Sequence, residues 1–127
     1  WNLRHEADLV IARPSGYCDE VEIKVSASDI KADTVKRYDH WENSRILRVW
    51  FAVPEELKDH PDIPEKAGIL AVKMNVSEHR GISFKVTVHR PAAIRPKDKR
   101  RKITDKQRLK LAELAAMRVW ALKERLG

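Results

Sequence analysis

Alternation of apolar and charged residues near the start of the chain predicts two strands. Residues 7–12 are rich in aliphatic and β-branched side chains, which are typical of a strand. From residue 20 to residue 25, charged and aliphatic side chains alternate strictly, a period that places them on opposite faces of a strand. Pro14 and Gly16 between the two segments suit the central positions of a turn. We therefore expect a β-hairpin.

Longer apolar patterns predict the remaining elements of the first three quarters of the chain. Residues 26–40 suit a helix that Ser26 or Ser28 caps, with Asp29 in its first turn. The mostly apolar run 46–53 predicts a strand buried on both faces. A short helix over 55–58 follows Pro54. Residues 67–73 and 82–88 predict two more strands, the last of them at an edge of the sheet.

The rest of the chain has a different pattern. Residues 91–103 carry two prolines and a basic run, which indicates a linker outside the core. Thr104 and Gln107 fit a capping box at the start of a helix that runs to about Leu126. This helix has an apolar stripe formed by Leu109, Ala112, Ala116, Val119 and Trp120. The element order predicts an α/β protein built around one sheet.

Composition indicates the domain organisation of the protein and its cellular compartment. With 127 residues, the chain suits one domain: a core over 1–94, a linker over 95–103 and a C-terminal helix over 104–127 packed on that same domain. No apolar run is long enough to cross a bilayer. Cys18 is the single cysteine, so a disulfide within the chain is excluded and a cytoplasmic protein is expected.

Charge divides the chain into two unequal parts. Residues 1–94 hold 14 Lys+Arg and 15 Asp+Glu, a net charge of −1, whereas residues 95–127 hold 12 and 4, a net charge of +8. The excess of positive charge is typical of proteins that bind nucleic acid. We expect its phosphate contacts to come from Lys97, Lys99, Arg100, Arg101 and Lys102.

The predicted turn fixes a register for the hairpin, and this register brings two carboxylates together. A three-residue loop 14–16 places Arg13 opposite Tyr17, so Asp8 lies opposite Glu22. Opposed side chains in an antiparallel pair have Cβ atoms about 4.5–5.5 Å apart. Two facing carboxylates repel unless a cation lies between them, and hard oxygen ligands favour Mg²⁺ or Mn²⁺. Lys24 lies on the same face, where it could stabilise charge on a phosphodiester.

These residues resemble a known superfamily. Asp8, the turn and Glu22-Ile23-Lys24 are similar to the D…(D/E)-x-K core of the PD-(D/E)XK, or restriction-endonuclease-like, nucleases, including small stand-alone proteins of phage and bacterial genomes. The resemblance implies a mixed sheet with a central β-hairpin and flanking helices. It also implies Mg²⁺-dependent phosphodiester hydrolysis, with Asp8 and Glu22 as metal ligands, the Ile23 carbonyl as a third ligand and Lys24 as a catalytic residue.

The chain departs from the family pattern at several positions. Ala7 replaces the proline that names the motif, and the acidic helix that many members place before the first strand is absent. Glu6 is a candidate substitute, because the register places it opposite Lys24 on the same face. Three further candidates for contacts to nucleic acid are associated with the following helix: Lys31, Lys36 and His40.

Three functions remain open from the sequence alone. The first is a nuclease acting on DNA, with an endonuclease as the working expectation and RNA as an open alternative. The second is a catalytically inactive nucleic-acid-binding module with a degenerate nuclease fold. The third is a protein-interaction domain with a solubilising basic tail. The apolar stripe on the C-terminal helix leaves a homodimer open under each of them.

Overall fold

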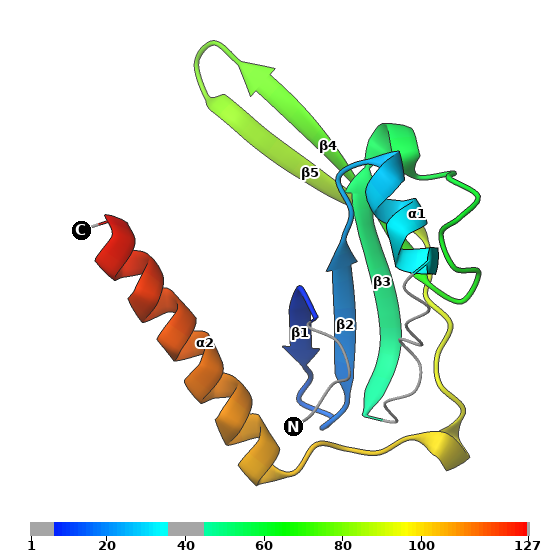
Figure 1. Ribbon diagram of the computed structural model, residues 1–127, viewed down its shortest axis with the longest axis vertical. Helices are drawn as coiled ribbons and strands as arrows, with labels where there is room; N and C mark the ends of the chain where they lie inside the picture. The colour runs from blue at the N-terminus through cyan, green and yellow to red at the C-terminus, as the bar shows by residue number, and fades with distance from the viewer. Residues whose placement is uncertain (1–6, 36–44, 127) are drawn as a thin grey trace.

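The protein is built on one five-stranded mixed sheet with the strand order β1-β2-β3-β4-β5 (Figure 1). The structure, a computed structural model, describes residues 7–35 and 45–126. The β1–β2 and β4–β5 pairs are antiparallel, and the β2–β3 and β3–β4 pairs are parallel. The strands are β1 (Leu9–Ala12), β2 (Cys18–Ile23), β3 (Ile46–Pro54), β4 (Gly68–Ser77) and β5 (Gly81–Arg90). The helices are α1 (Ala27–Val35) and α2 (Asp105–Leu126), with 3-10 turns η1 (Glu55–Leu57) and η2 (Lys97–Lys99).

The β1–β2 hairpin has the predicted register. Leu9 pairs with Val21, and the Arg13 amide donates to the Tyr17 carbonyl at 2.9 Å across the turn. Gly16 has a φ of 90°, a left-handed conformation that a side chain would oppose. The prediction of a central hairpin is wrong, however, because β1 is an edge strand of the described sheet. Local turn chemistry sets the register of a pair but not its place in the sheet.

The α1 helix begins as its cap predicts. The Asp29 amide donates to Ser26 Oγ at 3.2 Å, which makes Ser26 the cap. The described helix extends to Val35, and residues 36–40 of the predicted helix lie outside the described residues. Ile30 is fully buried, so α1 covers one face of the sheet and joins β2 to the parallel strand β3 (Figure 1).

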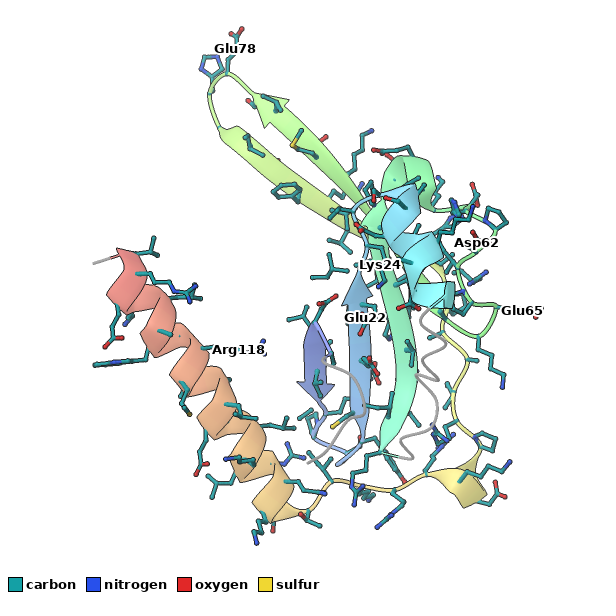
Figure 2. All side chains as sticks on the ribbon, viewed as in Figure 1. Glu22, Lys24, Asp62, Glu65, Glu78 and Arg118 are labelled. Carbon is teal, nitrogen blue, oxygen red and sulfur yellow. The ribbon has the colours of Figure 1, made fainter. Side chains whose placement is uncertain are left out.

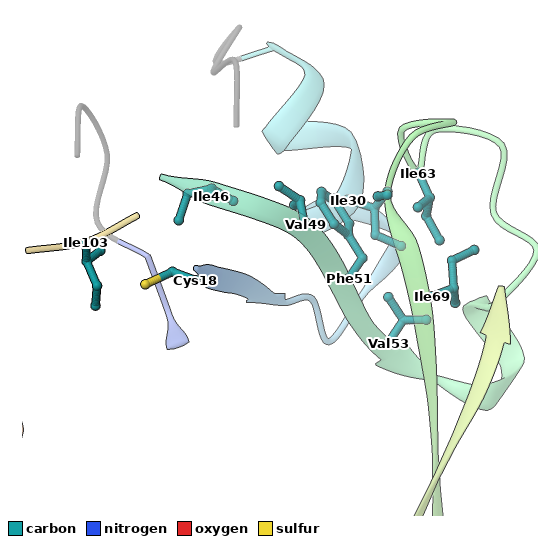
Figure 3. Close-up of a cluster of buried hydrophobic side chains, with 10 residues drawn as sticks. Cys18, Ile30, Ile46, Val49, Phe51, Val53, Ile63, Ile69 and Ile103 are labelled. Carbon is teal, nitrogen blue, oxygen red and sulfur yellow. The ribbon is translucent and has the colours of Figure 1, made fainter. Parts of the chain in front are cut away.

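The hydrophobic core lies between α1 and this one face of the sheet (Figure 3). Val49, Phe51 and Val53 alternate along β3 and are all buried. The side chains between them on β3 are only half-buried, so the prediction that this strand is buried on both faces is wrong. Ile103 is buried in the same core, so the basic linker also contributes to packing. On the opposite face of the sheet, Asp19 and Val21 of β2 are buried, but no described helix covers the β4–β5 part of that face (Figure 1).

Two elements extend away from this core. Every residue of β5 except Arg90 is exposed, and β4 is exposed from Lys73 onward. In α2 the predicted capping box forms, since the Gln107 amide donates to Thr104 Oγ1 at 3.1 Å. We expected α2 to pack on the domain, but only Gln107, Arg108 and Leu111 in its first two turns are partly covered. An apolar stripe creates a surface for burial without determining which surface covers it.

Candidate functional site

The predicted site lies where β2 ends and β1 begins. The register places Asp8, one residue before β1, opposite Glu22 near the end of β2. The Ile23 amide donates to Asp8 Oδ2 at 2.8 Å, which holds the Asp8 carboxylate against the neighbouring strand. The Asp8 side chain is exposed, whereas Glu22 is only 5% exposed. The hairpin register is the predicted one, whereas a metal ion shared by the two acids stays a prediction.

Lys24 extends the β2 strand by one residue and directs its amine into the layer below α1. Its amide donates to the Ala52 carbonyl at 3.0 Å. Its ammonium lies 3.1 Å from Asp33 Oδ1 and 3.8 Å from Glu22 Oε2, and 5.9 Å from the centre of the Phe51 ring. Figure 2 shows Lys24 and Glu22 together beside α1. Two carboxylates therefore hold the ammonium in a site where the Lys24 side chain is 14% exposed.

Asp33 is a member of this site that the sequence reasoning missed. It is 7% exposed and lies on α1, three residues after the buried Ile30. Residues three apart lie on the same helix face, so an acid on the buried face was the available signal. A buried carboxylate requires a partner, and Lys24 supplies one.

Glu20 and Asp19 are two further buried acids, and they lie on opposite faces of β2. Glu20 is fully buried on the same face as Glu22, because side chains two apart share a face of a strand. Asp19 on the other face accepts hydrogen bonds from Arg13 and from Trp50 Nε1 at 3.2 Å. The hydrogen bond that Arg13 donates to Asp19 raises the pKa of Arg13 above its usual value. Asp19 is therefore held by cations and the indole, away from the predicted site.

The ligands at the predicted site suit a magnesium ion that keeps some of its water. No group of three or more His, Cys, Asp or Glu in residues 7–35 and 45–126 is arranged to hold a metal. Mg²⁺ is commonly bound by one or two carboxylates, with waters and substrate phosphates completing its shell. Asp8 and Glu22 supply two carboxylates. The Ile23 carbonyl is directed to the β1 side, as is the Ile23 amide that bonds Asp8. Glu6 lies outside the described residues.

The basic linker lies at the other end of β2. The Ile103 amide donates to the Gly16 carbonyl at 2.8 Å, and the Lys102 ammonium lies 5.6 Å from the centre of the Tyr17 ring. These contacts hold the linker beside the β1–β2 turn, whereas Lys24 follows the opposite end of β2 (Figure 1). Arg100 donates to the Arg95 carbonyl at 2.6 Å and is partly buried. The remaining predicted linker contacts are exposed: Lys97, Lys99, Arg101 and Lys102.

The helix candidates for contacts to nucleic acid fall on both sides of the boundary of the described residues. Lys31 is exposed on α1, whereas Lys36 and His40 lie outside the described residues. No described helix combines the length and hydropathy needed to cross a bilayer.

Comparisons with known proteins identify a fold relative without a known activity. The sequence matches no protein-family model and no curated protein. Its structure is similar to that of the SPO1766 protein of unknown function from Silicibacter pomeroyi, with a TM-score of 0.60 and 22% sequence identity. The match covers 95% of this chain and 73% of that one. The similarity supports an α/β fold with a five-stranded mixed sheet and two α-helices.

Proposed function

We propose that this protein is a divalent-metal-dependent nuclease that hydrolyses phosphodiester bonds of DNA at Asp8, Glu22 and Lys24. The observation that carries the proposal is the hairpin register, in which Leu9 pairs with Val21. This register sets Asp8 opposite Glu22, with the ammonium of Lys24 3.8 Å from the Glu22 carboxylate. Two acids and one amine on a single face are the groups that such a reaction needs.

Each residue has a distinct role in the proposed reaction. Asp8, Glu22 and the Ile23 carbonyl would hold Mg²⁺ or Mn²⁺, which supplies charge stabilisation and an activated water. Lys24 donates hydrogen bonds to a phosphate oxygen and stabilises the negative charge that develops there. Asp33 is a positioning residue, because its carboxylate holds the Lys24 ammonium at 3.1 Å. The buried layer around Phe51 and Lys24 strengthens these electrostatic interactions by limiting access of water.

Binding and chemistry occupy opposite ends of β2 in this proposal. The strand has six residues and is therefore about 20 Å long at about 3.3 Å per residue. Phosphates along one strand of DNA are spaced by about 3.4 Å, so the linker and the site would be about six phosphates apart. The linker would thus orient the substrate at a distance and make no contact with the scissile phosphate. RNA remains a second substrate to test, because phosphate contacts do not depend on base sequence.

A non-catalytic nucleic-acid-binding module is the second candidate function. The observation that favours it is the Lys24 ammonium, which lies closer to Asp33 at 3.1 Å than to Glu22 at 3.8 Å. An ammonium engaged in a largely buried ion pair would serve stability instead of catalysis. This candidate keeps salt-dependent binding through the linker and lacks metal-dependent cleavage.

A cleavage assay separates the two candidates. Supercoiled plasmid and labelled single- and double-stranded oligonucleotides are incubated with the full chain in Mg²⁺, in Mn²⁺ and in EDTA. We expect cleavage that requires metal and that Asp8→Asn and Glu22→Gln reduce by at least about 100-fold. Glu78→Gln is the matched control, because Glu78 lies at the tip of the β4–β5 hairpin, far from the site (Figure 2). Metal-independent cleavage, or binding without cleavage in either metal, contradicts the nuclease proposal.

A further inference from the structure

The β4–β5 hairpin has one apolar face and one polar face. Met74 pairs with Phe84 and Val76 with Ile82, and Val86 and Val88 continue the apolar face along β5. These six side chains are 57–72% exposed. The positions between them carry polar groups, including the Asn75–Ser83 and Lys73–Lys85 pairs. A solvated hairpin would not need such segregation, so the apolar face is built to be covered.

The apolar hairpin face continues onto the uncovered face of the sheet. A cavity of about 330 Å³ lies at the base of the hairpin, where Ile23 and Ala52 meet Met74 and Phe84. Leu9 and Ile11 add two more exposed apolar side chains on β1, and the β1–β2 register places them on the same sheet face. This face of the hairpin presents only uncharged side chains, so it does not suit the phosphates of a nucleic acid.

The α2 helix carries the second uncovered apolar surface. On the side of the helix that carries the apolar stripe, four large apolar side chains are 55–88% exposed: Leu109, Val119, Trp120 and Leu126. From Leu109 to Leu126 these side chains span about 26 Å of helix at about 1.5 Å per residue. On β5 the exposed apolar side chains run from Ile82 to Val88, about 20 Å at about 3.3 Å per residue. The two surfaces are therefore similar in length and in chemistry.

We infer that a second copy of this chain covers both surfaces, with α2 of each copy lying on the β4–β5 hairpin of the other. Within one chain, Gln107 accepts a hydrogen bond from Arg45 and Arg108 donates to the Arg13 carbonyl, at 3.1 Å each. These contacts anchor the start of α2 near the β1–β2 turn, whereas β5 forms the opposite edge of the sheet (Figure 1). A twofold axis brings the two surfaces together without breaking that anchor.

The surface available suits a stable dimer. A fully buried aliphatic or aromatic side chain removes roughly 60–120 Å² of apolar area from water. At the observed exposures, the six hairpin side chains and the four on this side of α2 offer roughly 600 Å² per chain. Stable protein interfaces bury about 600–1,000 Å² per partner, so these two surfaces supply enough apolar area for one.

Sedimentation equilibrium of the full chain tests the dimer. The chain has a mass of 14.7 kDa, and we expect twice that mass at micromolar concentration. Phe84→Asp and Trp120→Asp should each raise the dissociation constant at least about thirtyfold, the effect of losing an interface hot spot. Ser83→Asp is the matched control on the polar face of the same strand and should remain dimeric. Circular dichroism verifies that each variant is folded.

Mixing the two variants tests the exchange itself. In a mixed dimer, the intact α2 of the Phe84→Asp chain meets the intact hairpin of the Trp120→Asp chain, so a dimer should re-form. A helix-to-helix interface would leave Phe84→Asp dimeric on its own, and a hairpin-to-hairpin interface would leave Trp120→Asp dimeric on its own. No dimer in the mixture, a dimer that persists in either variant alone, or a wild-type monomer overturns the inference. The last result would assign the apolar faces to intramolecular docking of α2 or to a different protein.

Discussion

Replacing Asp33 with Asn should destabilise the protein because it removes the ion pair between Asp33 and the Lys24 ammonium. The two side chains are 7% and 14% exposed, and their charged atoms lie 3.1 Å apart. At an effective dielectric constant of about 20, a full charge pair at this distance is worth about 5 kcal/mol. A neutral amide costs less free energy to bury than a carboxylate, which offsets part of this lost attraction. The Glu22 carboxylate also remains 3.8 Å from the ammonium. We therefore expect a loss of about 2 kcal/mol in the free energy of unfolding.

Urea denaturation measures this loss in the free energy of unfolding, and the DNA-cleavage assay measures its effect on the proposed activity. A loss of about 2 kcal/mol moves the unfolding midpoint down by about 1 M urea for a small domain. Asp29→Asn is the matched control on the same helix, because the Asp29 carboxylate accepts a long hydrogen bond of 3.3 Å from the Val25 amide, which an Asn side-chain oxygen can also accept. It should cost less than about 1 kcal/mol. Equal stability of Asp33→Asn and the wild type, or a larger loss in Asp29→Asn, would refute the reasoning.

The structure makes three further predictions. Gly68→Ala should cost about 3 kcal/mol in a thermal melt, because a Cβ would lie 2.3 Å from the Trp50 ring and 2.7 Å from the Ala92 amide nitrogen. Burial raises the pKa of Cys18, so its contribution to stability is complete below the unfolded pKa of about 8.5 and declines as the pH rises further. Mass spectrometry should find its alkylation at pH 8 much slower in native than in urea-unfolded protein. In a DNA-binding titration, the slope of log K against log salt should fall by up to about 2.7 when three exposed linker cations are changed to Gln: Lys97, Lys99 and Arg101.

The sequence predicted those features that local chemistry determines. The Pro14–Gly16 turn is enough to place Leu9 opposite Val21, since the length of a tight turn sets the register of its hairpin. The cap at Ser26 and the capping box at Thr104 are likewise local. Glu22 and Lys24 are neighbours for the same reason, because they belong to one strand and its continuation, whereas a site that they share with Asp8 stays a prediction.

Features that depend on contacts between distant elements were missed. Asp33 reaches Lys24 only because α1 packs back across β2, and nothing in the spacing of the two residues indicates that contact. The position of β1 at the sheet edge follows from the order of all five strands. The β4 strand extends to Ser77, beyond the predicted end at 73, although Met74 and Val76 continue its alternation. That longer strand creates the uncovered apolar hairpin face.

The most direct measurement of the central proposal is the rate of Mg²⁺-dependent DNA cleavage by Lys24→Ala relative to the wild type. Lys24 is assigned to charge stabilisation and not to metal binding, so its removal tests the chemistry of the site. The account predicts a rate at least about 100-fold lower at saturating Mg²⁺, in a protein whose circular dichroism spectrum still shows the native fold. Cleavage by Lys24→Ala within about threefold of the wild-type rate would contradict it.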